Sequence, residues 1–261
     1  MRVLLICDDY WHPGQVAIDG VNLLEKAGCC SDSRSSKENC SLSESFQFDI
    51  ITNANDFSPE FLKAEKNSSD PNSQSSILNS FKYPVVLLCK SDETSQADRQ
   101  PWKTEAIQKA FIDYIESGGG LVAVHSAVVK GKNTEALDKL IGCRFLSHPN
   151  ACPVTVQPLK PHPVTEGVEL FRETDEHYKI EIITPDVDVL LASYSPQQGE
   201  ESKYQEDPYY NTPAAIYPAG YARAQGNGRV CVLTPGHTPA MWSNPQFQRL
   251  LFNALKWAAG Y

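Results

Sequence analysis

The sequence carries little positive charge and lacks the short motifs that commonly bind nucleotides or zinc. The net charge is −9 and no basic run exceeds two residues, which argues against nucleic acid and anionic membranes as partners. Without GxGxxG or GxxxxGK[ST] a nucleotide phosphate cradle is unsupported. C-x-x-C, H-E-x-x-H and G-x-S-x-G are also absent, which argues against a zinc knuckle, a zincin and a hydrolase nucleophile elbow.

Long hydrophobic runs are missing as well. The segment Met1–Asp9 has an apolar core of only five residues, which is too short for a signal peptide or a membrane span. It predicts the first buried strand of a parallel sheet instead, so we expect a cytoplasmic protein with no membrane partner. With 41% hydrophobic residues, residues 1–261 suffice for a single large α/β domain.

The eight cysteines are distributed as in a reduced protein. Three of them lie in predicted buried strands, where a free cysteine packs as a small hydrophobe: Cys7, Cys89 and Cys231. A disulfide from Cys29 or Cys30 to Cys40 is the alternative. Both cysteine placement and the amino-terminal segment therefore favour the cytosol.

Strand and helix patterns alternate in the first half of the chain. Near-continuous apolar runs predict strands covered on both faces: Val3–Cys7, Phe48–Thr52, Val85–Cys89 and Leu121–His125. Apolar helical stripes lie in Trp102–Ser117, which Gly118 caps, and in Phe247–Trp257. This alternation predicts an α/β fold with a doubly wound, mostly parallel sheet flanked by helices.

The second half has strands with short turns and little helix between them. They are predicted at Val154–Gln157, Tyr178–Ile183, Val187–Ser193, Ala214–Tyr217 and Arg229–Thr234. We expect them to add antiparallel strands at one side of the same sheet. The polar stretches 30–45 and 66–80 are predicted to be mobile insertions, and Pro196–Thr212 is either a plain loop or a flap near the ligand.

Candidate site residues follow the ends of the predicted strands, where ligands bind in open α/β sheets. The catalytic candidates are His125, Asp175, Glu176 and His237. Candidates for substrate contacts are Asp8, Trp11, His12, Ser126, Tyr178 and Trp242, and those for a metal are His148 and His162. Each has a structural alternative: a histidine bonded at the sheet rim, an aromatic ring in the core, or a solvated turn at Asp175-Glu176.

Three chemistries can use this set. The imidazoles and carboxylates can bind a divalent ion such as Zn, Mn or Ni. Acid–base catalysis can pair Asp175 or Glu176 with His125 or His237. The third chemistry is nucleophilic attack by Ser126 with a histidine as base, although Ser126 does not lie in the G-x-S-x-G motif of a nucleophile elbow.

Several of these segments, taken in order, resemble the trehalose-utilisation (ThuA-like) family of the class I glutamine amidotransferase-like superfamily. The matching pieces are Gly118–Ala127, Ile141–Phe145 with His148-Pro149, His162–Thr165, Asp175–Tyr178, Gly228–Val230 with Gly236-His237, and Asn253–Gly260. The resemblance implies a flavodoxin-like sheet with an extension in the second half. It spans nearly the whole chain.

The resemblance also implies a function in carbohydrate metabolism, with a small-molecule disaccharide or keto-sugar derivative as substrate. Where related amidotransferases carry a nucleophilic cysteine, this chain has His125-Ser126 and no cysteine within ten residues, so glutaminase activity is unsupported. The enzyme would act by acid–base chemistry, with a divalent metal as an optional cofactor that polarises a ketone. The alternatives are a non-catalytic sugar-binding or regulatory protein and a Ser126-dependent hydrolase. A homo-oligomer is left open.

Overall fold

The computed structural model describes residues 1–27, 46–65, 81–195 and 216–261. The predicted insertions 30–45 and 66–80 lie outside these residues, as do the stretch Pro196–Thr212 and the alternative Cys29 or Cys30 to Cys40 disulfide. Within the described part, the five cysteines are buried and free. No helix there is both long enough and apolar enough to cross a membrane.

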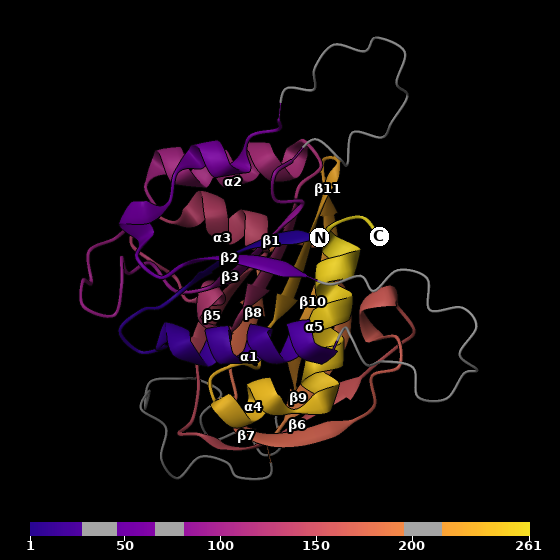
Figure 1. Ribbon diagram of the computed structural model, residues 1–261. Helices are drawn as coiled ribbons and strands as arrows, with labels where there is room; N and C mark the ends of the chain where they lie inside the picture. The colour runs from indigo at the N-terminus through magenta and orange to yellow at the C-terminus, as the bar shows by residue number, and fades with distance from the viewer. Residues whose placement is uncertain (28–45, 66–80, 196–215) are drawn as a thin grey trace, which may run out of the picture.

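One nine-stranded sheet of described residues organises the fold, in the order β2-β1-β3-β4-β11-β10-β9-β6-β7 (Figure 1). Its strands are β1 Arg2–Cys7, β2 Gln47–Ile51, β3 Val85–Cys89, β4 Gly120–Val124, β6 Cys152–Pro158, β7 Phe171–Asp175, β9 Asp188–Tyr194, β10 Tyr217–Gln225 and β11 Gly228–Leu233. The strands from β2 to β11 pair in parallel, and the pairings from β11 to β7 are antiparallel. The predicted fold class is thus confirmed.

Helices cover both faces of the sheet, which explains why its central strands are apolar on both sides. The helices are α1 Gly14–Ala27, α2 Glu105–Glu116, α3 Glu135–Ile141, α4 Pro239–Ser243 and α5 Pro245–Ala258. Alternate residues of β1 enter different cores: Val3 and Leu5 pack with α1, α4 and α5, whereas Leu4 packs with α2 and α3. Two hydrophobic layers therefore hold the sheet rigid beneath its loops.

Three predicted strands of the second half are placed differently from the expectation. Arg229–Thr234 becomes β11, which lies in the middle of the sheet and pairs in parallel with β4. Tyr178–Ile183 becomes β8 Lys179–Ile182, which leaves the main sheet and pairs with β5 Cys143–Ser147. Of the strand expected at Ala214–Tyr217, only residues 216 and 217 are described, and β10 runs from Tyr217 to Gln225.

Candidate functional site

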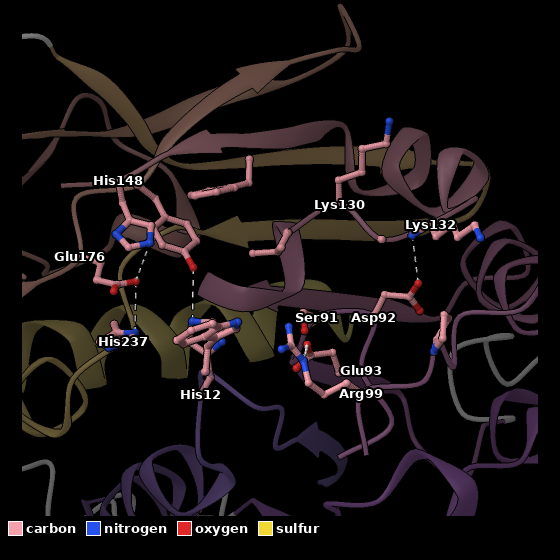
Figure 2. Close-up of a pocket in the computed structure, with 16 residues that line it drawn as sticks. His12, Ser91, Asp92, Glu93, Arg99, Lys130, Lys132, His148, Glu176 and His237 are labelled. Carbon is pink, nitrogen blue, oxygen red and sulfur yellow. Dashed lines mark hydrogen bonds and ion pairs between the residues drawn. The ribbon is translucent and has the colours of Figure 1, made fainter. Parts of the chain in front are cut away.

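Four side chains from distant parts of the sequence converge above the carboxyl edge of the parallel strands. Three of them, His12, Glu176 and His237, are labelled in Figure 2. His12 follows β1, His125 follows β4 and His237 follows β11, while Glu176 directly follows β7. Each offers one ligand atom, and these four atoms lie within 4.8 Å of one another. We call these four residues the His–Glu cluster. The parallel pairing of β4 with β11 brings two of its histidines together.

Glu176 lies at the centre of the contacts in this cluster. Its Oε2 is 3.5 Å from Nε2 of His125 and 3.3 Å from Nδ1 of His237. Nε2 of His148 also lies 3.5 Å from the same oxygen. Burial favours the neutral carboxyl, but the contacts with the imidazoles of His125, His148 and His237 lower the pKa of Glu176 to about 2. The carboxylate is therefore ionised at neutral pH.

Two of the cluster histidines are oriented by a hydrogen bond from their other ring nitrogen. Nδ1 of His12 donates to Oδ1 of Asp9 at 2.7 Å, and Nδ1 of His125 donates to the carbonyl of Thr234 at 2.8 Å. This fixes the tautomer in which Nε2 carries the lone pair. Histidine ligands of metal ions usually donate their other ring N–H to a carboxylate or a carbonyl in this way.

Asp9 is fully buried and anchors the loop that carries His12. Its carboxylate also accepts the backbone N–H groups of Trp11, His12 and Ser91. Burial opposes the charge, but the hydrogen bonds to His12, Ser91 and Trp11 lower the pKa of Asp9 to about 2. An ionised carboxylate therefore faces Nδ1 of His12.

The backbone at the end of β4 takes a conformation that few residues adopt. His125 has a φ of +49°, in the left-handed region that is disfavoured for side chains with a Cβ. Opposite it, Gly236 has a φ of +141°, and a Cβ there would lie 2.8 Å from Cγ1 of Val124. The glycine lets the loop after β11 approach His125 closely, which places His237 in the cluster.

The cluster residues fit a divalent metal ion. Tetrahedral coordination with metal–ligand distances of about 2.0–2.2 Å separates ligand atoms by roughly 3.4 Å, and Oε2 of Glu176 lies 3.5 and 3.3 Å from the nitrogens of His125 and His237. Nε2 of His125 is buried and makes no hydrogen bond within the described chain, although buried polar atoms nearly always have a partner. Three imidazoles and one carboxylate suit Zn, Mn or Ni.

His125 is in the protonation state that a metal ligand needs. Burial is the main reason that its pKa falls to about 4, and Glu176 only partly offsets this effect. The imidazole is therefore neutral at pH 7. Its lone pair on Nε2 is available to an ion.

Asp175 supports the cluster without entering it. The side chain is fully buried, and its carboxylate accepts the N–H groups of Gly236, His237 and Thr238 at 2.8, 2.8 and 3.1 Å. Burial raises its pKa to about 7, against the effect of these hydrogen bonds. The geometry makes Asp175 a positioning residue for the His237 loop.

Replacing Asp175 by alanine is expected to lower metal affinity about tenfold and the free energy of unfolding by about 2 kcal/mol, because three loop N–H groups lose their acceptor. Titration with Co²⁺ and urea denaturation measure the two effects. Asp188→Ala is the matched control, because Asp188 is half exposed and pairs with Lys160 on the surface. Unchanged Co²⁺ affinity in Asp175→Ala would contradict the positioning role.

A cavity of about 510 Å³ opens in front of the cluster, within the range of small-molecule sites. In Figure 2, His148, Glu176 and His237 lie at one end and Lys132 at the other, with Asp92 and Arg99 between. The lining residues are Trp11, His12, Ser91, Asp92, Glu93, Arg99, Pro101, Val129, Lys130, Gly131, Lys132, Phe145, His148, Glu176, Tyr178 and His237. The lining therefore combines charged and polar side chains with apolar ones, and it offers hydrogen-bonding groups along its length.

Tyr178 and His148 complete the predicted residues that meet at this cavity. The hydroxyl of Tyr178 lies 3.3 Å from Nε2 of His12. Its ring packs against that of His125 with centroids 3.8 Å apart and against that of His148 at 5.4 Å. Tyr178 was expected to begin the strand Tyr178–Ile183, but it lies in the loop between β7, which ends at Asp175, and β8, which begins at Lys179.

Three other predicted site residues, Asp8, Ser126 and Trp242, do not line this cavity. Asp8 accepts the N–H groups of Gly14 and Gln96 and so shapes the loop after β1. Ser126 and Trp242 are buried and line a separate space of about 20 Å³, and the indole of Trp242 donates to the carbonyl of Gly236. These contacts are structural.

His162, which sequence analysis offered as a metal ligand, is not part of the His–Glu cluster. Its Nδ1 accepts the N–H of Val164, and its ring lies 5.3 Å from that of Trp257 on α5. The proline after it favours an extended turn. In the structure this turn packs against α5 rather than at the sheet edge that carries the cluster.

Sequence reasoning missed several residues at the site. Asp9 and Ser91 each lie two residues beyond the end of a strand, β1 and β3, and Asp92 follows Ser91, so the rule that ligands gather at strand ends could have found them. Asp9 and His12 are also three residues apart, a spacing that one turn can close. No sequence signal points to Arg99 or to Lys130, because their place at the cavity depends on loop folding.

Comparisons with known proteins agree with this fold. A family model described as ThuA, trehalose utilisation, matches residues 41–258. A protein of Bacteroides uniformis described as ThuA-like has 21% identity and a TM-score of 0.65, with 99% of this chain and 91% of that chain covered. A ThuA-like protein of Parabacteroides merdae has 18% identity and a TM-score of 0.65, with 100% and 90% covered. No curated protein matches the chain.

Proposed function

This chain belongs to the trehalose-utilisation (ThuA) family, and on that premise we propose that it is a divalent-metal-dependent enzyme acting on a carbohydrate by acid–base chemistry. The observation that carries the proposal is the convergence of His12, His125, Glu176 and His237, whose ligand atoms lie within 4.8 Å of one another at the edge of a cavity. Membership of the family supports the proposed substrate class, a disaccharide or keto-sugar derivative. The proposed compartment is the cytoplasm, supported by the five free cysteines of the described residues.

The four cluster residues would hold the ion, and the bound ion would act as a Lewis acid toward a carbonyl or hydroxyl oxygen of the substrate. His148 is placed to move a proton beside it. Its Nδ1 donates to the carbonyl of Pro149 at 2.8 Å, so Nε2 carries the lone pair and faces the cavity at 3.5 Å from Glu176. Tyr178 is the second proton-transfer candidate, because its hydroxyl lies beside His12.

The geometry favours this chemistry over a nucleophilic serine. Ser126 is 2% exposed and does not line the 510 Å³ cavity. A non-catalytic sugar-binding protein would use the same cavity, and turnover distinguishes it from an enzyme. A protein that binds trehalose or 3-ketotrehalose but converts neither would support the non-catalytic alternative.

Metal analysis of protein purified without a histidine tag tests the proposal. We expect one Zn, Mn or Ni ion per chain. Incubation with a chelator should abolish conversion of trehalose or 3-ketotrehalose, and adding the ion back should restore it. Conversion that survives complete removal of the ion would refute metal dependence, and fewer than about one ion per ten chains after incubation with each metal would refute the metal site.

A further inference from the structure

Two large aromatic rings stand in solvent beside the cavity, in the loop between β1 and α1. Trp11 is 60% exposed and Tyr10 is 46% exposed. Their ring centroids are 4.8 Å apart and the rings are nearly perpendicular. Trp11 lines the cavity and directly precedes the cluster residue His12. We call Tyr10 and Trp11 the aromatic ledge.

Polar contacts hold the ledge in place. Glu93 accepts the backbone N–H of Tyr10 at 2.9 Å and Nε of Arg99 at 2.7 Å. The guanidinium of Arg99 then lies 4.6 Å from the ring centroid of Tyr10 and 5.9 Å from that of Trp11, within the range of cation–π attraction. The backbone N–H of Trp11 bonds to the buried Asp9. The ledge is therefore a built surface rather than a loose loop tip.

The other aromatic candidates for substrate stacking already have packing partners. Trp242 is 2% exposed and its indole N–H is bonded to Gly236. Tyr178 is also 2% exposed, with its ring packed against His125 and His148. Trp11 alone among the three presents a large open ring surface to the cavity. An exposed apolar ring of this size at a cavity is a mark of ligand binding.

We propose that Trp11 is the stacking platform for a pyranose ring of the substrate, which deepens the proposed function and rests on it for the carbohydrate class. A pyranose has C–H groups on its faces and hydroxyl groups around its edge. The indole would cover one C–H face and remove apolar surface from water. The hydroxyl edge would meet the polar cavity groups, among them Ser91 and Asp92.

This placement sets the specificity of the site. Since Trp11 lines the same cavity as His12, Glu176 and His237, a ring stacked on the indole lies within reach of the His–Glu cluster. The substrate therefore presents a ring hydroxyl or ketone to the cluster while its C–H face rests on Trp11. An acyclic polyol has no such rigid face and is expected to bind more weakly than a pyranoside.

Saturation-transfer NMR with trehalose as the probe tests this proposal. Trehalose should receive saturation from the wild-type protein mainly at the C–H protons of one ring face, and sorbitol should receive much less. Trp11→Ala should raise the dissociation constant for trehalose about tenfold, within the range of aromatic stacking plus apolar burial. Trp11→Phe keeps an aromatic face and should stay within about threefold of wild type.

Tyr261→Ala is the matched control, because Tyr261 is also exposed, at 63%, and lies at the chain end rather than at the cavity. Its affinity for trehalose should equal that of wild type. Equal affinity in Trp11→Ala, or no saturation transfer to trehalose from wild type, would overturn the platform. Co²⁺ uptake is measured on every variant. Wild-type trehalose affinity in Trp11→Ala rejects the platform alone, whereas Co²⁺ uptake without trehalose binding in the wild-type protein also rejects the carbohydrate class on which the platform rests. Trehalose binding without Co²⁺ uptake rejects the metal site alone.

Discussion

Replacing Glu176 by glutamine is expected to lower the affinity of the protein for Co²⁺ by about 100-fold or more. Loss of an outer hydrogen-bond partner of a ligand costs 10- to 100-fold in metal affinity, and Glu176 is the only carboxylate in the four-residue cluster. The amide keeps the size of the side chain but removes its charge and presents an N–H₂ group to the ion. Titration with Co²⁺, followed by its visible absorption bands, measures the change.

Glu181→Gln is the control for this substitution. Glu181 lies on β8, close in sequence, and forms a half-exposed ion pair with Arg144. Surface pairs of this kind contribute little to stability, so the control should bind Co²⁺ with wild-type affinity. If Glu176→Gln also bound Co²⁺ within about twofold of wild type, Glu176 would not be a ligand and the assigned metal centre would be wrong.

Replacing Asp9 by alanine should weaken both the fold and the cluster. Three backbone N–H groups lose their acceptor, and Nδ1 of His12 loses the carboxylate that fixes its tautomer. We expect the free energy of unfolding to fall by about 3 kcal/mol and the melting temperature by roughly 10 °C. Affinity for Co²⁺ should drop about 10- to 100-fold. Differential scanning calorimetry and the Co²⁺ titration measure these effects.

The neighbouring substitution Asp8→Ala separates the contribution of this loop to stability from its contribution to metal binding. Asp8 accepts two loop N–H groups but contacts no cluster residue through a hydrogen bond among the described residues. It should lower stability and leave Co²⁺ affinity within about threefold of wild type. Wild-type Co²⁺ affinity in Asp9→Ala would show that Asp9 does not orient a metal ligand.

The sequence alone determined the fold class and the edge of the sheet where the site lies. Strands that helices cover on both faces are near-continuous apolar runs. The predicted bounds of β1, β3 and β4 therefore agree with those of the structure within one residue. Since the carboxyl ends of parallel strands share one edge, His12 and His125 were expected to lie near each other. This inference needs only local periodicity and chain direction.

Only the tertiary structure decided which residues face each other across that edge. Asp8 was the predicted site residue, but it has a φ of +82° and its side chain accepts the N–H of Gly14 in the following loop. Asp9 is the residue that bonds to His12. Asp175 and Glu176 are also neighbours with different roles: Asp175 accepts hydrogen bonds from a loop, whereas Glu176 belongs to the His–Glu cluster. Adjacent side chains leave a strand end in different directions, and a short sequence window does not reveal the direction of each.

The position of β11 in the sheet also depends on the tertiary structure. The apolar pattern of β11 is local, but its place in the sheet depends on two pairings. One is with β4, more than a hundred residues earlier in the chain, and the other is with β10, only a few residues earlier. That insertion sets His237 opposite His125. The sequence therefore determined that His12, His125 and His237 follow strands, but it did not predict β7, the strand that precedes Glu176. Long-range strand pairing and packing determined which strand ends form a site.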